Sequence, residues 1–131
     1  MKLTGNYLDM TENKHTVQQY MEGFKQTDRE TILSCLTDDV EWEIPGLFLS
    51  KGKAAFNDHI VDPGFAGNPI ISVTRMTEEN NVVVAEGTVL AKRDDGTSLP
   101  LAFCDVFELE NGKIRCLTSY LMETNIPRVS V

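Results

Sequence analysis

Four long strand-like segments occupy the second half of the 131-residue chain, and they constrain its fold more than any other feature. The segments cover residues 69–78, 82–92, 98–110 and 113–123, and the breaks between them are Asn80-Asn81, Asp94-Asp95-Gly96 and Asn111-Gly112. Asparagine, aspartate and glycine tolerate positive φ, so these breaks favour close hairpins and predict an antiparallel meander. Strands of ten or more residues exceed the usual length, and a sheet built from them should twist and curl. We therefore expect a sheet with one concave face.

The first half of the chain has the periodicity of helices. Apolar residues recur at helical spacing between residues 11 and 26, which predicts a helix whose buried side is formed by Val17, Tyr20, Met21 and Phe24. Thr27 and Glu30 have the spacing of a capping box, which predicts a second helix starting at Thr27. Residues 40–44 alternate like a half-buried strand, and residues 52–60 have the pattern of a third helix. Helices followed by strands indicate an α+β fold, in one domain spanning residues 1–131 with a core at about 12–124.

Composition argues against several classes of function. The net charge is −8 and the pI is about 4.7, which opposes binding to nucleic acid and to anionic membrane surfaces. No apolar run approaches the ~20 residues needed to cross a bilayer, and the first residues lack the apolar stretch of a signal peptide. The three cysteines, Cys35, Cys104 and Cys116, are widely spaced in apolar segments, as is typical of reduced core thiols. We therefore expect a cytoplasmic protein without nucleic acid or membrane partners.

The sequence predicts no metal and no cofactor. The two histidines, His15 and His59, lie far apart, and no acidic cluster has ligand spacing on one face. No glycine-rich phosphate loop is present, and residues 64–67 are expected to form a mobile flap instead. Apolar neighbours should raise the thiol pKa of the cysteines and weaken them as nucleophiles. Any chemistry must therefore come from other side chains.

Asp105 is the most unusual single residue, because it is a carboxylate inside the apolar run from Leu101 to Leu109. Phe103 and Phe107 flank it at period two and share its strand face. Burying an ionised carboxylate without partners is costly, so the group must be hydrogen-bonded, protonated or placed at the wall of a cavity. The alternative is that Asp105 lies at a strand bend and points to water.

Three segments, together with the order of elements, resemble a known family. They are Leu36-Thr37-Asp38-Asp39-Val40-Glu41-Trp42, Lys51-Gly52-Lys53 and Glu108-Leu109-Glu110-Asn111-Gly112-Lys113-Ile114. Over residues 16–123 the chain resembles the SnoaL-like branch of the nuclear transport factor two superfamily, which includes ketosteroid isomerases, polyketide cyclases and limonene epoxide hydrolases. The resemblance implies a cone-shaped, cystatin-like α+β roll. In this roll, three N-terminal helices pack on a strongly curved mixed, mainly antiparallel sheet.

The resemblance also implies a site. The catalytic tyrosine of the isomerases corresponds to Tyr20, and their protonated aspartic acid corresponds to Asp105, so these two residues are expected to form an oxyanion-binding pair. The isomerase base corresponds to Ile44, which cannot carry a proton. Its neighbour Glu43 should point to the opposite strand face unless a bulge intervenes. The hydrolase arginine corresponds to Phe103.

His59 could replace the missing base, since an imidazole exchanges protons near neutral pH, or it could simply terminate the third helix. His15 is expected at the surface, and Glu123 at the rim of the site. The expected ligand is a small hydrophobic or cyclic carbonyl-type molecule, contacted by Phe24, Trp42, Ile44, Phe56, Phe103, Phe107 and Leu117. The function is then either that of a cofactor-free isomerase, cyclase or hydrolase, or that of a non-catalytic binding or accessory protein. A purely structural dimerisation domain is the third alternative.

The other face of the sheet predicts assembly. Small apolar residues are expected there, from one strand Ala102, Cys104 and Val106 and from another Val83, Ala85, Gly87 and Val89. A face this apolar is unusual for solvent exposure, and the helices can cover only one side of the sheet. We therefore expect a homodimer formed through the outer sheet face, with Glu86 and Glu108 at its rim.

Overall fold

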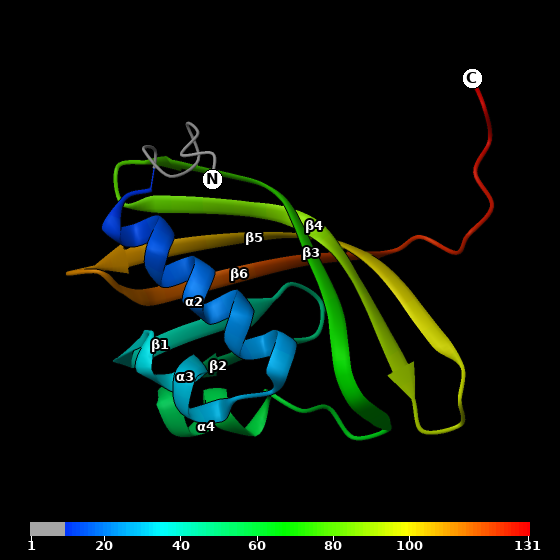
Figure 1. The fold of residues 1–131 in the computed structure, drawn as a ribbon, viewed down its shortest axis with the longest axis horizontal. Helices are drawn as coiled ribbons and strands as arrows, with labels where there is room; N and C mark the ends of the chain where they lie inside the picture. Colours follow the sequence, from blue (N-terminus) through cyan, green and yellow to red (C-terminus); the bar gives the residue numbers. More distant parts are fainter. Residues whose placement is uncertain (1–9) are drawn as a thin grey trace, which may run out of the picture.

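The computed structural model describes residues 10–131, which form three helices and six strands within that range (Figure 1). In chain order these are α2 (Glu12–Gln26), α3 (Arg29–Ser34), β1 (Leu36–Ile44), β2 (Phe48–Lys51), α4 (Lys53–Asp58), β3 (Phe65–Glu79), β4 (Val82–Arg93), β5 (Ser98–Glu110) and β6 (Lys113–Glu123). None of these helices is long and apolar enough to span a membrane. The predicted α+β class is confirmed.

All six strands belong to one sheet, in the order β2-β1-β6-β5-β4-β3. β1 runs parallel to β6, and every other neighbouring pair is antiparallel. Asn80, Asn81 and Asn111 adopt positive φ at the predicted hairpins, and so do Gly96 and Gly112. The meander is therefore confirmed, and its turns form for the expected reason.

The sheet bends strongly along β3 and β4, and α2 crosses its concave face (Figure 1). At the bend, the pairing of β3 with β4 shifts register between Val73 and Arg75. A Cβ atom on Gly87 would lie 1.9 Å from the carbonyl oxygen of Ser72 and 2.9 Å from the Phe103 ring. Only glycine allows the two strands and the ring to approach this closely. The concave face therefore depends on a position without a side chain.

The start of the second helix differs from the prediction by one residue. Thr27 has φ 51° and ends α2, with the Asp28 N–H donating to the Gly23 carbonyl, as in a Schellman motif. Asp28 is the N-cap of α3, and its carboxylate accepts from the Thr31 N–H. The predicted capping box at Thr27 is therefore wrong. The Thr27 hydroxyl bonds the side chain of Asn68 instead, a distant contact that no local pattern reveals.

Two strand boundaries and one additional strand also differ from the prediction. β1 begins at Leu36, because that buried residue pairs with Ile114 of β6. β2 was not expected, and it forms because the turn after Ile44 folds Phe48–Lys51 back onto β1. β3 begins at Phe65, which pairs with Arg93, so most of the expected flap at residues 64–67 belongs to a strand.

The two faces of β4 are the reverse of the prediction. Ala85 pairs with Asp105 and Val83 with Phe107, so these β4 residues share the concave face, where both are fully buried. The convex, outer face of β4 carries the even-numbered residues from Val84 to Leu90 instead. A register difference of one residue moves every side chain to the other face. For β5 the prediction is confirmed, since Cys104 points away from Asp105.

Candidate functional site

A cavity of about 720 Å³ lies at the concave face of the sheet and opens to solvent. Its lining comes from α2, from the segment after α4 and from all six strands. Most lining side chains are apolar, and the volume falls in the range of about 300–1,000 Å³ typical of small-molecule sites. Of the predicted site residues, the following line it: Tyr20, Phe24, Trp42, Ile44, His59, Phe103 and Asp105.

The other three predicted ligand contacts lie behind this lining. Phe56, Phe107 and Leu117 are almost completely inaccessible to solvent and belong to the core. Phe56 stacks on Trp42 with ring centroids 4.5 Å apart, and Phe107 meets Tyr20 edge-on at 5.3 Å. These contacts hold the lining rings in place. The structure therefore gives these three residues a supporting position instead of direct contact with the cavity.

Asp105 lies on the concave face of β5 with 8% of its surface exposed. Burial raises the pKa of its carboxyl group from 3.8 to about 7, although hydrogen bonding by Ser119 opposes the rise. An apolar environment disfavours the charged form, and a donor favours it. All three expected outcomes are thus combined, because the carboxyl group is hydrogen-bonded by Ser119, lies at a cavity wall and holds its proton up to nearly neutral pH.

Ser119 is a site residue that the sequence interpretation missed. It is the cross-strand partner of Asp105 on β6, lines the cavity and is 4% exposed. Its Oγ accepts a hydrogen bond of 3.0 Å from Trp42 Nε1. The polar centre of the cavity is therefore built from β1, β5 and β6 together.

Tyr20 brings a second hydroxyl into the same cavity from α2. Burial raises its pKa well above the ordinary value of 10.0, and the nearby negative charge of Asp105 raises it further. Tyr20 is therefore a neutral phenol that can donate a hydrogen bond. Among residues 10–131, no direct hydrogen bond joins it to Asp105, so the oxyanion pair stays a prediction about the ligand-bound state.

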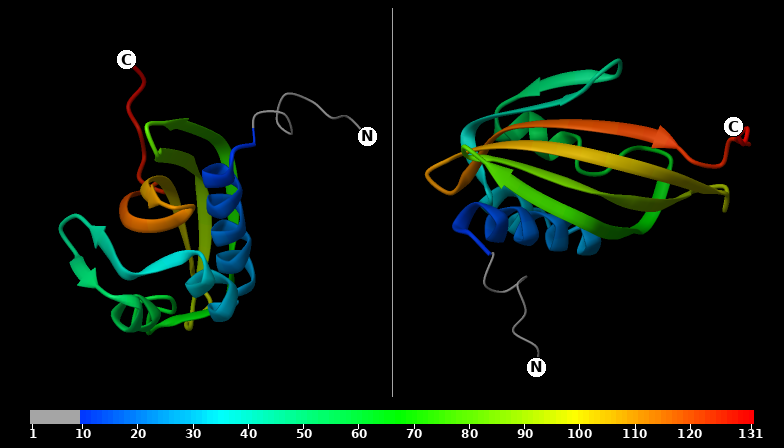
Figure 2. Two further views of the ribbon diagram at one scale, coloured as in Figure 1. Left: turned by 90° about the vertical axis from the view of Figure 1, so that its left-hand side faces the viewer. Right: turned by 90° about the horizontal axis from the view of Figure 1, so that it is seen from above.

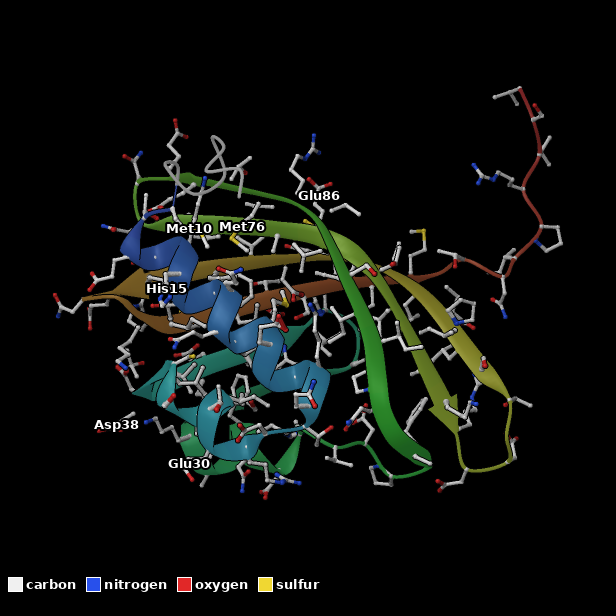
Figure 3. All side chains as sticks on the ribbon, viewed as in Figure 1. Met10, His15, Glu30, Asp38, Met76 and Glu86 are labelled. Carbon is white, nitrogen blue, oxygen red and sulfur yellow. The ribbon has the colours of Figure 1, made fainter. Side chains whose placement is uncertain are left out.

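His59 follows α4 as its C-cap residue and also lines the cavity, so its position suits both predicted roles. Its Nδ1 lies 2.9 Å from the carbonyl oxygen of Ala55. A carbonyl can only accept, so Nδ1 must carry a proton, and in the neutral ring Nε2 then has the free lone pair. The ring packs against Phe48 with centroids 4.2 Å apart. The other histidine, His15, is exposed on α2 (Figure 3).

The remaining ionisable residues are less well placed for proton transfer. Ile44 lines the cavity at the isomerase base position, while Glu43 is exposed on the opposite face of β1. Glu123 lies at the cavity but is exposed, as expected for the rim.

Burial raises the thiol pKa of all three cysteines, as expected for poor nucleophiles. Within residues 10–131, no group of three or more histidine, cysteine, aspartate or glutamate side chains is arranged to hold a metal ion.

Comparison with known proteins identifies the family. The model of the SnoaL-like domain matches residues 17–117, so the chain belongs to the SnoaL-like family, as its motifs predicted. Solved structures of this fold include an LEH-like epoxide hydrolase of M. tuberculosis, with 19% identity, a TM-score of 0.76, and 87% of this chain and 85% of that chain covered. An NTF2-like protein of unknown function from Burkholderia pseudomallei has 25% identity, a TM-score of 0.76, and coverage of 84% and 90%. TerC, co-crystallised with polyporic acid, has 25% identity, a TM-score of 0.75, and coverage of 83% and 90%. A search of curated proteins gave no significant match.

Proposed function

We propose that this protein binds a small hydrophobic, cyclic carbonyl compound and moves a proton on it without a cofactor. The observation that carries the proposal is the position of Asp105, a carboxyl group with a pKa of about 7 at the wall of an open apolar cavity. A neutral carboxylic acid donates a stronger hydrogen bond than water can in such a site. The ligand class follows from the surroundings of this donor, since most of the cavity wall is apolar and aromatic.

Each polar residue of the cavity has a role in this proposal. Asp105 donates its proton towards the carbonyl oxygen, and the Tyr20 phenol is the second donor. His59 Nε2 accepts a proton from the carbon next to the carbonyl, because its Nδ1 is held in the protonated form by Ala55. The product of this step is an enol. Returning the proton at another carbon gives isomerisation, and attack by the enol on a second carbonyl gives cyclisation.

The relatives guide the choice of the first compounds. TerC was co-crystallised with polyporic acid, which makes that compound the first ligand to test. The M. tuberculosis relative is an epoxide hydrolase, but this chain has Phe103 where the superfamily hydrolases have an arginine. We therefore rank isomerase or cyclase chemistry above epoxide hydrolysis.

Exchange of hydrogen for deuterium tests the proposed chemistry without knowledge of the natural substrate. Conjugated cyclic ketones are incubated with the protein in D₂O, and loss of the proton next to the carbonyl is followed by NMR. We expect exchange faster than in buffer, and about 10²- to 10⁴-fold slower exchange in Asp105→Leu or His59→Gln, which is the usual contribution of acid–base groups. His15→Gln is the matched control, because His15 is exposed and should not affect the rate. Equal rates in the wild type and the Asp105→Leu variant would contradict the proposal.

A second candidate function is ligand binding without chemistry. It is favoured by Ile44, which lines the cavity where the isomerase base would stand and cannot accept a proton. Fluorescence of Trp42 distinguishes the two functions, since it is the only tryptophan of the chain and lines the cavity. Quenching by polyporic acid without deuterium exchange in any ketone would favour the accessory protein.

We further propose that two copies pair through the outer sheet face. The exposed apolar residues of the outer, convex face of the sheet are Ile70, Leu90, Tyr120 and Met122. They surround smaller residues of β5, among them Ala102 and Cys104, and α2 and α3 lie on the other side of the sheet (Figure 2). Because a two-fold axis brings the same patch of two copies together and covers it on both, a second copy of the chain is the favoured partner. The free thiols Cys35, Cys104 and Cys116 favour a reducing location, the cytoplasm.

A further inference from the structure

The indole of Trp42, the hydroxyl of Ser119 and the carboxyl group of Asp105 follow one another across three neighbouring strands. Trp42 Nε1 donates to Ser119 Oγ over 3.0 Å, and Ser119 is paired with Asp105 across β5 and β6. An indole N–H can only donate, whereas a hydroxyl both donates and accepts. Since Ser119 Oγ accepts from Trp42, its own hydrogen is free for Asp105. The donor direction that follows is from Trp42 to Ser119 and on to Asp105, the residue whose pKa hydrogen bonding by Ser119 lowers.

We propose that Trp42 and Ser119 are positioning residues, and that their directed hydrogen-bond chain decides which oxygen of Asp105 faces the cavity with its proton. One carboxyl oxygen accepts from Ser119, so the proton of the neutral acid belongs on the other oxygen. The hydrogen-bond chain itself is a property of the ligand-free protein. Its importance for catalysis rests on the proposed function.

Packing fixes the first donor of this chain. Phe56 stacks on the Trp42 indole with an interplanar angle of 25°, and Phe48 stands against it at 87° with centroids 5.3 Å apart. Trp42 and Ser119 are 7% and 4% exposed, so water has little access to either group. An indole held on two sides cannot rotate away without opening the core. Its N–H therefore points constantly at Ser119, and the Ser119 hydrogen cannot turn back towards it.

Among residues 10–131, no ionisable side chain takes the place of Ser119 as the hydrogen-bond donor beside Asp105. The neighbouring residue on β4 is Ala85, which is apolar, and α2 contributes the neutral phenol of Tyr20. The other ionisable residues that line the cavity are His59, Asp62, Lys92, Arg93 and Glu123. Of these, Asp62, Lys92 and Glu123 are exposed, so water screens their charges. Ser119 is thus the donor to which Asp105 responds most directly.

Because Trp42 is the only tryptophan of the sequence, the hydrogen-bond chain can be followed by one NMR signal. The indole N–H of Trp42 gives one ¹H–¹⁵N NMR signal, which we would follow from about pH 5 to about pH 9 in the ligand-free protein. When Asp105 ionises it pulls on the Ser119 hydrogen, which makes Oγ a stronger acceptor for the indole. The His59 ring stands edge-on to the Trp42 indole with centroids 6.5 Å apart, so the signal is followed in the His59→Gln background. We expect it to move there with a midpoint of about 7, and to stay constant when Asp105→Asn is added. In Ser119→Ala the link is cut, and the signal should no longer follow Asp105.

Ser50→Ala is the matched control. Ser50 is also a buried serine opposite Trp42, on β2, but its hydroxyl has no hydrogen-bond partner among the described residues. Its removal should leave the titration of the indole signal unchanged. If Ser119→Ala does not fold, Ser119→Cys keeps the volume with a weak donor and should reduce the amplitude of the titration.

Two results would overturn the proposal. One is an indole signal that does not move through the titration of Asp105 in the His59→Gln background. The other is a signal that still moves in Ser119→Ala. Neither result depends on turnover, so a failure here is distinct from a failure to find deuterium exchange. Deuterium exchange by the wild type, together with an indole signal that does not change with pH, would contradict only the hydrogen-bond chain. The proposed enzyme function would not be affected.

Discussion

Replacing Asp105 by asparagine should remove a loss of stability that the wild type undergoes as pH rises towards 7. The pKa of Asp105 is about 7 in the folded protein and near 3.8 when the chain is unfolded. Between these values the folded state binds a proton that the unfolded state has lost, so stability falls as pH rises. Each pH unit corresponds to 1.36 kcal/mol, and a window of about 3 units gives a loss of about 4 kcal/mol above pH 7. Asparagine has nearly the same shape and cannot ionise, so the variant avoids this loss.

Urea denaturation of both proteins at several pH values tests this reasoning. Below about pH 3 the difference in unfolding free energy should be small and constant, because Asp105 is then protonated in both states. From there to about pH 7 the unfolding free energy of the variant should rise relative to that of the wild type, by up to about 4 kcal/mol, at an unchanged m-value. The unfolding free energy of a typical domain is only about 5–15 kcal/mol, so a change of this size is easily measured.

A second aspartate provides a control with the opposite sign. Hydrogen bonds from Thr97 lower the pKa of the exposed Asp95, so its contribution to stability is lost as pH falls. Asp95→Asn should therefore lose its difference from the wild type at low pH, and it should not reproduce the gain of Asp105→Asn at high pH. Parallel stability curves for the wild type and Asp105→Asn would refute the assignment of a raised pKa to Asp105.

Three further predictions concern the fold and assembly. Gly87→Ala places a methyl group against Phe103 and a backbone oxygen, so chemical denaturation should show a loss of about 3 kcal/mol or more, and an unchanged midpoint would contradict the close strand approach. Tyr120→Glu introduces a charge into the outer face, so sedimentation should show a monomer where the wild type is a dimer, and a monomeric wild type would end the dimer proposal. Asn68→Ala should lose about 1 kcal/mol in the wild type but almost nothing in a Thr27→Gly background, because the Thr27 hydroxyl is then already absent; equal losses in both backgrounds would show that the hydrogen bond is unimportant.

Local chemistry was enough to predict the meander and the place of Asp105. The hairpins depend on residues such as Asn80 and Gly112, whose tolerance of positive φ is an intrinsic property. The alternation of Phe103, Asp105 and Phe107 likewise places all three on one face without knowledge of any partner strand. The fold class, the order of the four meander strands and the buried acid could therefore be derived from the chain itself, whereas β2 and the parallel pairing of β1 with β6 were not predicted.

Local sequence does not determine which residues pair across neighbouring strands. The incorrect predictions of strand face and register arise from these pairings. The run Val82-Val83-Val84-Ala85 is apolar on both faces, so alternation cannot say which side is inner. Counting back from the pair Glu110 and Lys113 would place Thr118 opposite Asp105, but a register shift between Glu108 and Leu109 puts Ser119 there. A bulge of one residue thus decided which hydroxyl reaches the carboxyl group.

The claim on which the other conclusions depend is that Asp105 remains protonated near neutral pH inside the cavity. A ¹³C NMR titration of the Asp105 carboxyl carbon in the folded wild type, assigned by its absence in Asp105→Asn, measures this directly. We predict a midpoint of about 7 for this carbon. A midpoint near the ordinary value of 3.8 would show that the carboxyl group is solvated and ionised, and it would contradict its role as a proton donor to a bound carbonyl compound.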